Sequence, residues 1–198
     1  MGVLNVGFFG GAFDPPHKGH EEIVSLSVSV LGLDKLYVCP TGGVVGEKSG
    51  SVSGYEKRLR MATEAFSKAQ RIKVVNWEQH EKSSYTFNTV SNLIKNKKQH
   101  TNFFVIMGMD SFLGIQSWKK HKQLFDLVNV VVFPRAGISE LEVKSLVSKL
   151  NKAKVNLSGL IFVEKSILNV SSSEIRRGGY NKNKYITSNV LDIYLKED

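Results

Sequence analysis

Two histidines and two glycines lie close together near the start of the chain. Gly10 and Gly11 end an apolar run that begins at Val3, and His17 and His20 follow a proline turn at the head of an expected helix. Glycine lets backbone N–H groups approach phosphate oxygens, and a helix N-terminus offers unpaired N–H donors with partial positive charge. Histidines spaced in this way share one helix face and can reach one ligand together. The segment therefore predicts a site for the phosphates of a nucleotide.

A second candidate phosphate site lies near the C-terminus. Ser171, Ser172 and Ser173 stand at the start of an expected helix, and Arg176 follows one turn later. Hydroxyls, free backbone N–H groups and a guanidinium would then converge on one spot, which favours phosphate binding. A serine that only caps the helix explains the same residues equally well.

Gly108 and Asp110 follow a strongly apolar segment. The Asp110 carboxylate can accept hydrogen bonds from ribose hydroxyls, or it can cap the next helix. The opening segment matches neither a GxGxxG dinucleotide fingerprint nor a Walker A loop, since no Gly-Lys-Ser/Thr follows it. Zinc held by His17, His20 and Asp14 is an alternative, but no third His or Glu at helical spacing supports it. We therefore predict no metal site built from protein side chains.

Apolar segments typical of strands alternate with segments of helical character along the whole chain. The expected strands are residues 3–9, 35–39, 72–77, 102–107, 128–133 and 160–163. The expected helices are residues 21–31, 55–69, 86–96, 111–125 (broken), 139–150, 171–177 and 184–195. Strands that are apolar on both faces predict a doubly wound, Rossmann-like α/β fold, in which helices cover both faces of a parallel sheet. Such sheets bind ligands at the carboxyl ends of their strands, where the candidate residues lie.

The composition is that of a globular chain. Its 198 residues are 41% hydrophobic and 23% charged, which excludes disordered and fibrous classes. This length predicts one domain over residues 1–198, with a C-terminal helical portion from about residue 171. Cys39 has no disulfide partner, no apolar run approaches the roughly 18–20 residues of a membrane span, and the start lacks a signal peptide's positive region. We expect a cytoplasmic protein with no membrane partner.

The formal net charge of +9 suits a phosphate-rich ligand. The lysine clusters at residues 95–98, 119–122 and 181–184 are short and separate, and most of these lysines are expected to form a solvated surface. A nucleic-acid groove normally combines a basic stripe with stacking aromatic residues, so we predict no nucleic-acid partner. The composition leaves a homo-oligomer open.

Together these motifs resemble those of the bacterial nicotinate mononucleotide adenylyltransferases, within the nucleotidyltransferase superfamily marked by an H-x-G-H signature. That signature stands here as His17-Lys18-Gly19-His20. The superfamily's second signature, I-S-S-T-x-I-R, is matched by residues 170–176, with Ser173 at the Thr position. Weaker matches lie between the two signatures, at residues 60–61, 84–86, 108–111, 118 and 134–135, so the resemblance covers nearly the whole chain in order.

The resemblance implies transfer of the adenylyl group of ATP to nicotinate mononucleotide, which gives deamido-NAD and pyrophosphate with Mg²⁺, a step of NAD biosynthesis. It implies that His17 and His20 are the catalytic residues and contact the ATP phosphates. The ATP-binding residues that it implies are Gly10, Gly11, Phe13, His17, His20, Gly108, Asp110, Ser172 and Arg176. The implied residues for the mononucleotide substrate are Tyr85, Thr86, Trp118, Lys48 and Arg135.

The chain departs from this family after the second expected strand. Family members commonly carry Pro-Pro-His-Lys there, whereas residues 41–48 read Thr-Gly-Gly-Val-Val-Gly-Glu-Lys. Residues 41–54 are rich in Gly and Ser, which predicts a mobile loop. Since that loop normally closes on the substrates, two alternatives stay open. One is a related transferase with another phosphate acceptor, such as nicotinamide mononucleotide or phosphopantetheine, and the other is a nucleotide-binding paralogue without turnover.

Overall fold

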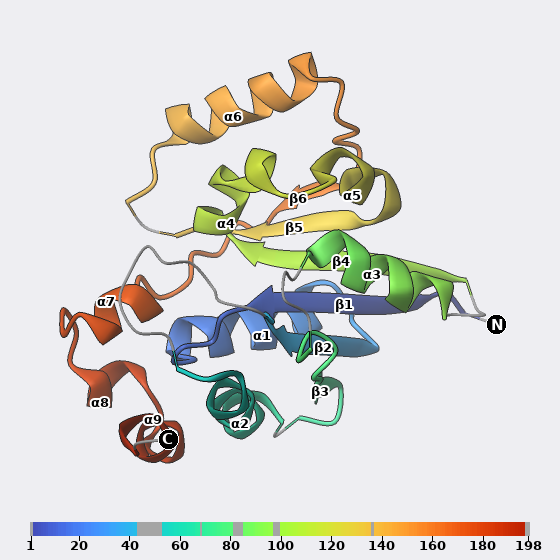
Figure 1. Cartoon of the computed structure of the whole chain (residues 1–198). Helices are drawn as coiled ribbons and strands as arrows, with labels where there is room; N and C mark the ends of the chain where they lie inside the picture. Colours follow the sequence, from blue (N-terminus) through green and yellow to red (C-terminus); the bar gives the residue numbers. More distant parts are fainter. Residues whose placement is uncertain are drawn as a thin grey trace.

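In the computed structural model, residues 2–42, 53–67, 69–80, 85–96, 100–135 and 137–196 are described. Across this part of the chain, parallel strands form one six-stranded sheet in the order β3-β2-β1-β4-β5-β6 (Figure 1). The strands are β1 (Leu4–Gly11), β2 (Lys35–Pro40), β3 (Ile72–Val74), β4 (Thr101–Gly108), β5 (Asn129–Phe133) and β6 (Leu160–Phe162). The strand order reverses between β1 and β4, which is the place where such sheets bind ligands.

Helices cover both faces of this sheet, as the sequence predicts. They are α1 (Lys18–Val30), α2 (Tyr55–Phe66), α3 (Thr86–Lys95), α4 (Met109–Leu113), the 3₁₀ helix η1 (Ile115–Ser117), α5 (His121–Leu127), α6 (Glu140–Lys152), α7 (Ser172–Arg176), α8 (Lys182–Tyr185) and α9 (Ser188–Leu195). Successive side chains of a strand point to opposite faces. Phe8 accordingly packs in the core under α3 to α6, and Phe9 packs in the core under α1 and α2. The doubly wound α/β prediction is confirmed.

The C-terminal helices differ from the prediction of one helix over residues 184–195. Two short helices, α8 and α9, are separated by extended backbone at Ile186 and Thr187. The Ile186 side chain is buried in a small cluster with Met61 and Val190, and this burial requires the chain to leave the helix there. In Figure 1 these helices lie beyond the carboxyl ends of the strands, with α9 beside α2.

Several element boundaries also differ from the expected ranges by a few residues. The first helix begins at Lys18 rather than residue 21, because His17 caps it. The third strand ends at Val74 rather than residue 77. The mobile-loop prediction for residues 41–54 falls mainly on positions 43–52, which lie outside the described residues. Among the helices that are described, none combines the length and the apolar character that a membrane crossing requires.

Candidate active site

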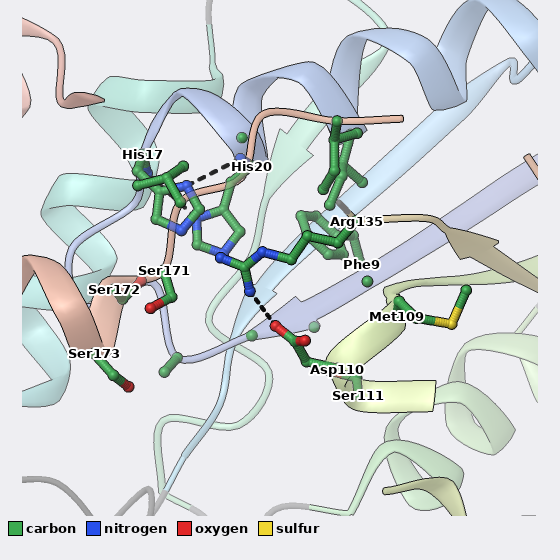
Figure 2. A pocket seen from close by; sticks show the side chains of 18 residues that line it. Phe9, His17, His20, Met109, Asp110, Ser111, Arg135, Ser171, Ser172 and Ser173 are labelled. Atoms are coloured by element: carbon green, nitrogen blue, oxygen red, sulfur yellow. Dashed lines mark hydrogen bonds and ion pairs between the residues drawn. The ribbon is translucent and has the colours of Figure 1, made fainter. Parts of the chain in front are cut away.

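A cavity of about 250 Å³ opens at the carboxyl ends of β1 and β4 (Figure 2). It brings together three groups that the sequence predicts for nucleotide binding, although they come from distant parts of the chain. The residues that line it are Phe9, Gly10, Gly11, Ala12, His17, Gly19, His20, Ile23, Gly108, Met109, Asp110, Ser111, Arg135, Ile167, Val170, Ser171, Ser172 and Ser173. The cavity therefore lies at the switch in strand order.

The two histidines hold each other in place at the start of α1. The backbone N–H of His20 donates to Nδ1 of His17 at 3.4 Å, and that of His17 donates to Nδ1 of His20 at 3.3 Å. The rings stack with centroids 3.7 Å apart. Because each Nδ1 accepts a hydrogen bond, a neutral ring carries its proton on Nε2. This reciprocal cap turns two ordinary histidines into a fixed pair of N–H donors at the cavity wall.

Both rings are neutral near pH 7. Burial, together with the positive charge of Arg135, lowers the pKa of His17 from 6.5 to about 3. Burial also holds the pKa of His20 well below its ordinary value; a charge on His17, were it protonated, and the positive charge of Arg135 act in the same direction. Loss of hydration penalises an imidazolium in such a place. The pair therefore offers hydrogen bonds to a ligand without itself carrying charge.

Gly19 and Phe13 lie beside the histidine pair and account for the rest of the first signature. A Cβ at Gly19 would lie 3.1 Å from the Leu168 carbonyl oxygen and 3.2 Å from Nδ1 of His17, so a side chain here would require these neighbours to shift by a few tenths of an ångström. The Phe13 ring packs edge-on against His20, with centroids 5.3 Å apart. Phe13 is buried and does not line the cavity. Its side chain supports the His20 ring, and the ATP contact that the resemblance implies for Phe13 stays a prediction.

The second signature docks on the turn of the first. Ser172 Oγ donates to the Pro15 carbonyl oxygen at 2.9 Å, and Arg176 Nη1 donates to that of Asp14 at 2.5 Å. Ser171 caps α7 by accepting from the backbone N–H of Glu174, as the capping interpretation expects. Ser172 nevertheless lines the cavity, whereas Arg176 does not. Arg176 holds the turn that carries the histidines.

Asp110 and Arg135 form an ion pair across the cavity. Figure 2 shows the Arg135 guanidinium reaching between the His20 ring and the Asp110 carboxylate. Arg135 Nε also donates to Oδ1 of Asn169 at 2.8 Å. Gly108 occupies the N-cap position of α4, so Asp110 does not serve as the cap. Arg135, which the resemblance assigns to the mononucleotide substrate, lies in the same cavity as the histidines.

Three of the other residues predicted for the mononucleotide substrate lie outside this cavity. Tyr85 precedes α3 and Thr86 begins it. The Nζ atom of Lys119 lies 4.4 Å from the centre of the Tyr85 ring, which brings the segment after η1 against the start of α3. Trp118 is half-buried against the core on that side of the sheet. None of Tyr85, Thr86 and Trp118 lines the 250 Å³ cavity, and Lys48 lies outside the described residues.

Sequence reasoning missed two buried charges, Arg58 and Glu78, each only 2% exposed. Arg58 lies on the buried face of α2, together with Met61 and Ala62. The sequence did carry a signal for Arg58, because this charged residue falls on the apolar face of the helix predicted over residues 55–69. Glu78 follows β3 in an irregular stretch and gave no such signal.

Comparisons with known proteins agree with this geometry. A family model described as cytidylyltransferase-like matches residues 8–178, so the chain belongs to that family of nucleotidyltransferases. A protein of Vesicomyosocius okutanii is 31% identical over 178 residues, covering 86% of this chain and 83% of its own. One of Fusobacterium nucleatum is 29% identical over 180 residues, covering 90% and 89%. Both bear the name "Probable nicotinate-nucleotide adenylyltransferase", and within the family this chain is a member of that group of enzymes.

A solved structure shows the same fold. The nicotinic acid mononucleotide adenylyltransferase of Plasmodium falciparum, complexed with NaAD, superposes on the chain with a TM-score of 0.70 at 21% identity. The superposition covers 96% of this chain and 94% of the Plasmodium chain. The shared architecture therefore extends beyond the sheet to the C-terminal helices.

Proposed function

We propose that the protein transfers the adenylyl group of ATP to nicotinate mononucleotide, giving deamido-NAD and pyrophosphate. One observation carries the proposal: the neutral pair His17 and His20 shares a cavity with Ser172 from the second signature. The two rings supply two N–H donors suited to phosphate oxygens, set at the switch point of a parallel sheet. The names of the curated relatives supply the acceptor.

The chemistry needs no general base from the protein. The phosphate of the acceptor is an anion at neutral pH, so one of its oxygens can attack the α-phosphorus directly. A new P–O bond forms while the bond from the α-phosphorus to the bridging oxygen breaks, and pyrophosphate leaves. In this proposal the two Nε2–H donors stabilise charge that develops on the α-phosphate and the leaving group. Ser172 and the docked turn keep the polyphosphate aligned for attack.

ATP arrives as its magnesium complex, in which the phosphates themselves are ligands of the cation. Within the described residues, no three His, Cys, Asp or Glu side chains gather as a metal site. The donor set of the cavity is instead of the kind that binds phosphate. We therefore assign Mg²⁺ to the substrate rather than to a site built by the protein.

The Asp110–Arg135 pair suits the arrival of a nucleotide. Arg135 is 14% exposed and Asp110 is 62% exposed, so the carboxylate can turn towards solvent or a ligand at small cost. A phosphate would replace Asp110 as the partner of the guanidinium, and the released carboxylate would be free to accept from ribose hydroxyls.

Pyrophosphate release tests the proposal. The chain is incubated with ATP and Mg²⁺ and, in turn, with nicotinate mononucleotide, nicotinamide mononucleotide and phosphopantetheine. We expect release with nicotinate mononucleotide, and mass spectrometry should identify deamido-NAD. Release with only another acceptor would refute the choice of acceptor. Binding of ATP without release with any acceptor would favour a paralogue without turnover.

A further inference from the structure

One peptide group at the end of β2 is held from both sides by buried charges. Arg58 Nη2 donates to the Thr41 carbonyl oxygen at 2.9 Å. The N–H of the same peptide, that of Gly42, donates to Oε2 of Glu78 at 3.4 Å. Neither Arg58 nor Glu78 lines the cavity, and the mechanism above uses neither. Two charges buried around one uncharged peptide call for an explanation, because burial of a charge is costly.

Arg58 also connects the peptide to the nucleotide cavity. Its Nη1 donates to the Ala12 carbonyl oxygen at 3.0 Å, and its Nε donates to that of Ser53 at 3.1 Å. Ala12 lines the cavity between the glycine pair and the histidines. A guanidinium is planar and rigid, so three carbonyl oxygens bound to it are fixed relative to one another. Arg58 thus holds the turn after β1, the end of β2 and the start of α2 in one arrangement.

Glu78 connects the same peptide to α3. The hydroxyl of Thr89 donates to Oε1 of Glu78 at 2.6 Å. Thr89 lies one turn after Tyr85 and Thr86, the residues predicted to meet the pyridine end of the acceptor. One carboxylate therefore spans the gap between the end of β2 and the helix on which those residues stand. The described contacts run without a break from Ala12 through Arg58, the 41–42 peptide and Glu78 to Thr89.

We infer that Arg58 and Glu78 are positioning residues that set the distance between the nucleotide half and the acceptor half of the site. The Thr41–Gly42 peptide is the point where their two sets of contacts meet. Attack on the α-phosphorus requires the two substrates to be aligned closely, and neither His17 nor Tyr85 can provide that alignment from its own half alone. The assignment of the halves rests on the proposed function, whereas the contacts themselves do not.

Kinetics of single and double variants provide the first test. Arg58→Met and Glu78→Met each remove one side of the contact with the peptide. We expect each to lower kcat about 100-fold, the scale of a displacement of about 1 Å. The Kd of ATP measured by calorimetry should stay within about threefold for Glu78→Met, because the contacts of Glu78 reach Gly42 and Thr89 and not the cavity. The double variant should lose about as much kcat as either single variant, because the two residues act as one unit.

Conservative and control variants separate positioning from general damage. Glu78→Gln keeps an oxygen for the Gly42 N–H and an amide for Thr89, so it should recover most of the kcat that Glu78→Met loses. Arg71 donates to the Leu33 carbonyl oxygen and Asp34 accepts from the Asn5 N–H, both at the other end of the sheet. Arg71→Met and Asp34→Asn should leave kcat unchanged. Losses of kcat that multiply in the double variant, or an ATP Kd of Glu78→Met that rises as its kcat falls, would overturn the inference.

A second test does not depend on turnover. Urea unfolding of the wild type, the two Met variants and their double variant forms a thermodynamic cycle. We expect the double variant to lose clearly less stability than the two single losses added together, since both residues hold the same Thr41–Gly42 peptide. Additive losses would refute the shared peptide contact. If the wild type shows no turnover with any acceptor, the proposed function fails, while this cycle still tests the shared contact with the peptide on which the inference rests. Should a Met variant not fold, Arg58→Lys and Glu78→Asp complete the same cycle, since lysine lacks the planar guanidinium and aspartate is one methylene shorter.

Discussion

The stability of the fold should fall between pH 7.5 and pH 5 because of His17. This residue is 5% exposed, and its pKa is about 3 in the folded chain against 6.5 as the ordinary value. As the pH falls, the unfolded chain therefore takes up the proton first. The stability that the neutral His17 contributes is complete above pH 6.5 and is lost progressively towards pH 3. At pH 5 the loss amounts to about 2 kcal/mol.

The variant His17→Asn isolates this effect. Asparagine is among the best N-cap residues and can still accept from the His20 N–H, but it does not titrate. Free energies of unfolding are measured in urea at pH 7.5 and pH 5 for both proteins. We expect the wild type to lose about 2 kcal/mol more than the variant between these values. His20 contributes to the pH dependence in both proteins, because burial is the first cause of its lowered pKa and is present in both. Equal losses in the two proteins would refute the neutral, buried state of His17.

Three further predictions follow from the same cavity. His20→Ala should lower kcat about 100- to 1,000-fold while the fold remains intact by circular dichroism, and near-normal turnover would contradict the mechanism. Arg135→Met should raise the pKa of His17 and His20, whose values the Arg135 charge lowers, and NMR titration of the ring protons that shows no rise would refute this. Gly19→Ala places a methyl group 3.1 Å from the Leu168 carbonyl oxygen, so thermal unfolding should show a loss of about 1–3 kcal/mol. An unchanged Tm would mean that the 168–170 segment gives way easily.

The fold could be predicted because its strands carry their own signal. Runs such as residues 3–9 and 128–133 are apolar at successive positions, and only a sheet covered on both faces buries both sides of such a strand. The break between α8 and α9 gave no such signal. It depends on Ile186 reaching the cluster with Met61, which is a contact between segments far apart in the sequence.

The candidate site was predictable to the extent that its side chains belong to local motifs. The histidine pair, Asp110 and Ser172 stand at strand or helix ends, and the structure brings them to one cavity. The Asp110–Arg135 pair could not be foreseen, because it depends on β4 and β5 being neighbours in the sheet. The burial of Glu78 likewise depends on the end of β2 and on α3 meeting around it.

The neutral state of the histidines bears on how the cavity could favour the transition state over bound ATP. Arg135 and burial keep both rings uncharged before a ligand enters. A bound phosphate opposes the two effects that lower the histidine pKa values. Its negative charge pairs with Arg135, and it favours the imidazolium form of a buried ring. In the proposed reaction that charge grows on the departing pyrophosphate, so hydrogen bonds from the two rings strengthen as the bond breaks. Donors that strengthen in this way lower the barrier, whereas two permanent cations would bind the ground state and the transition state more equally.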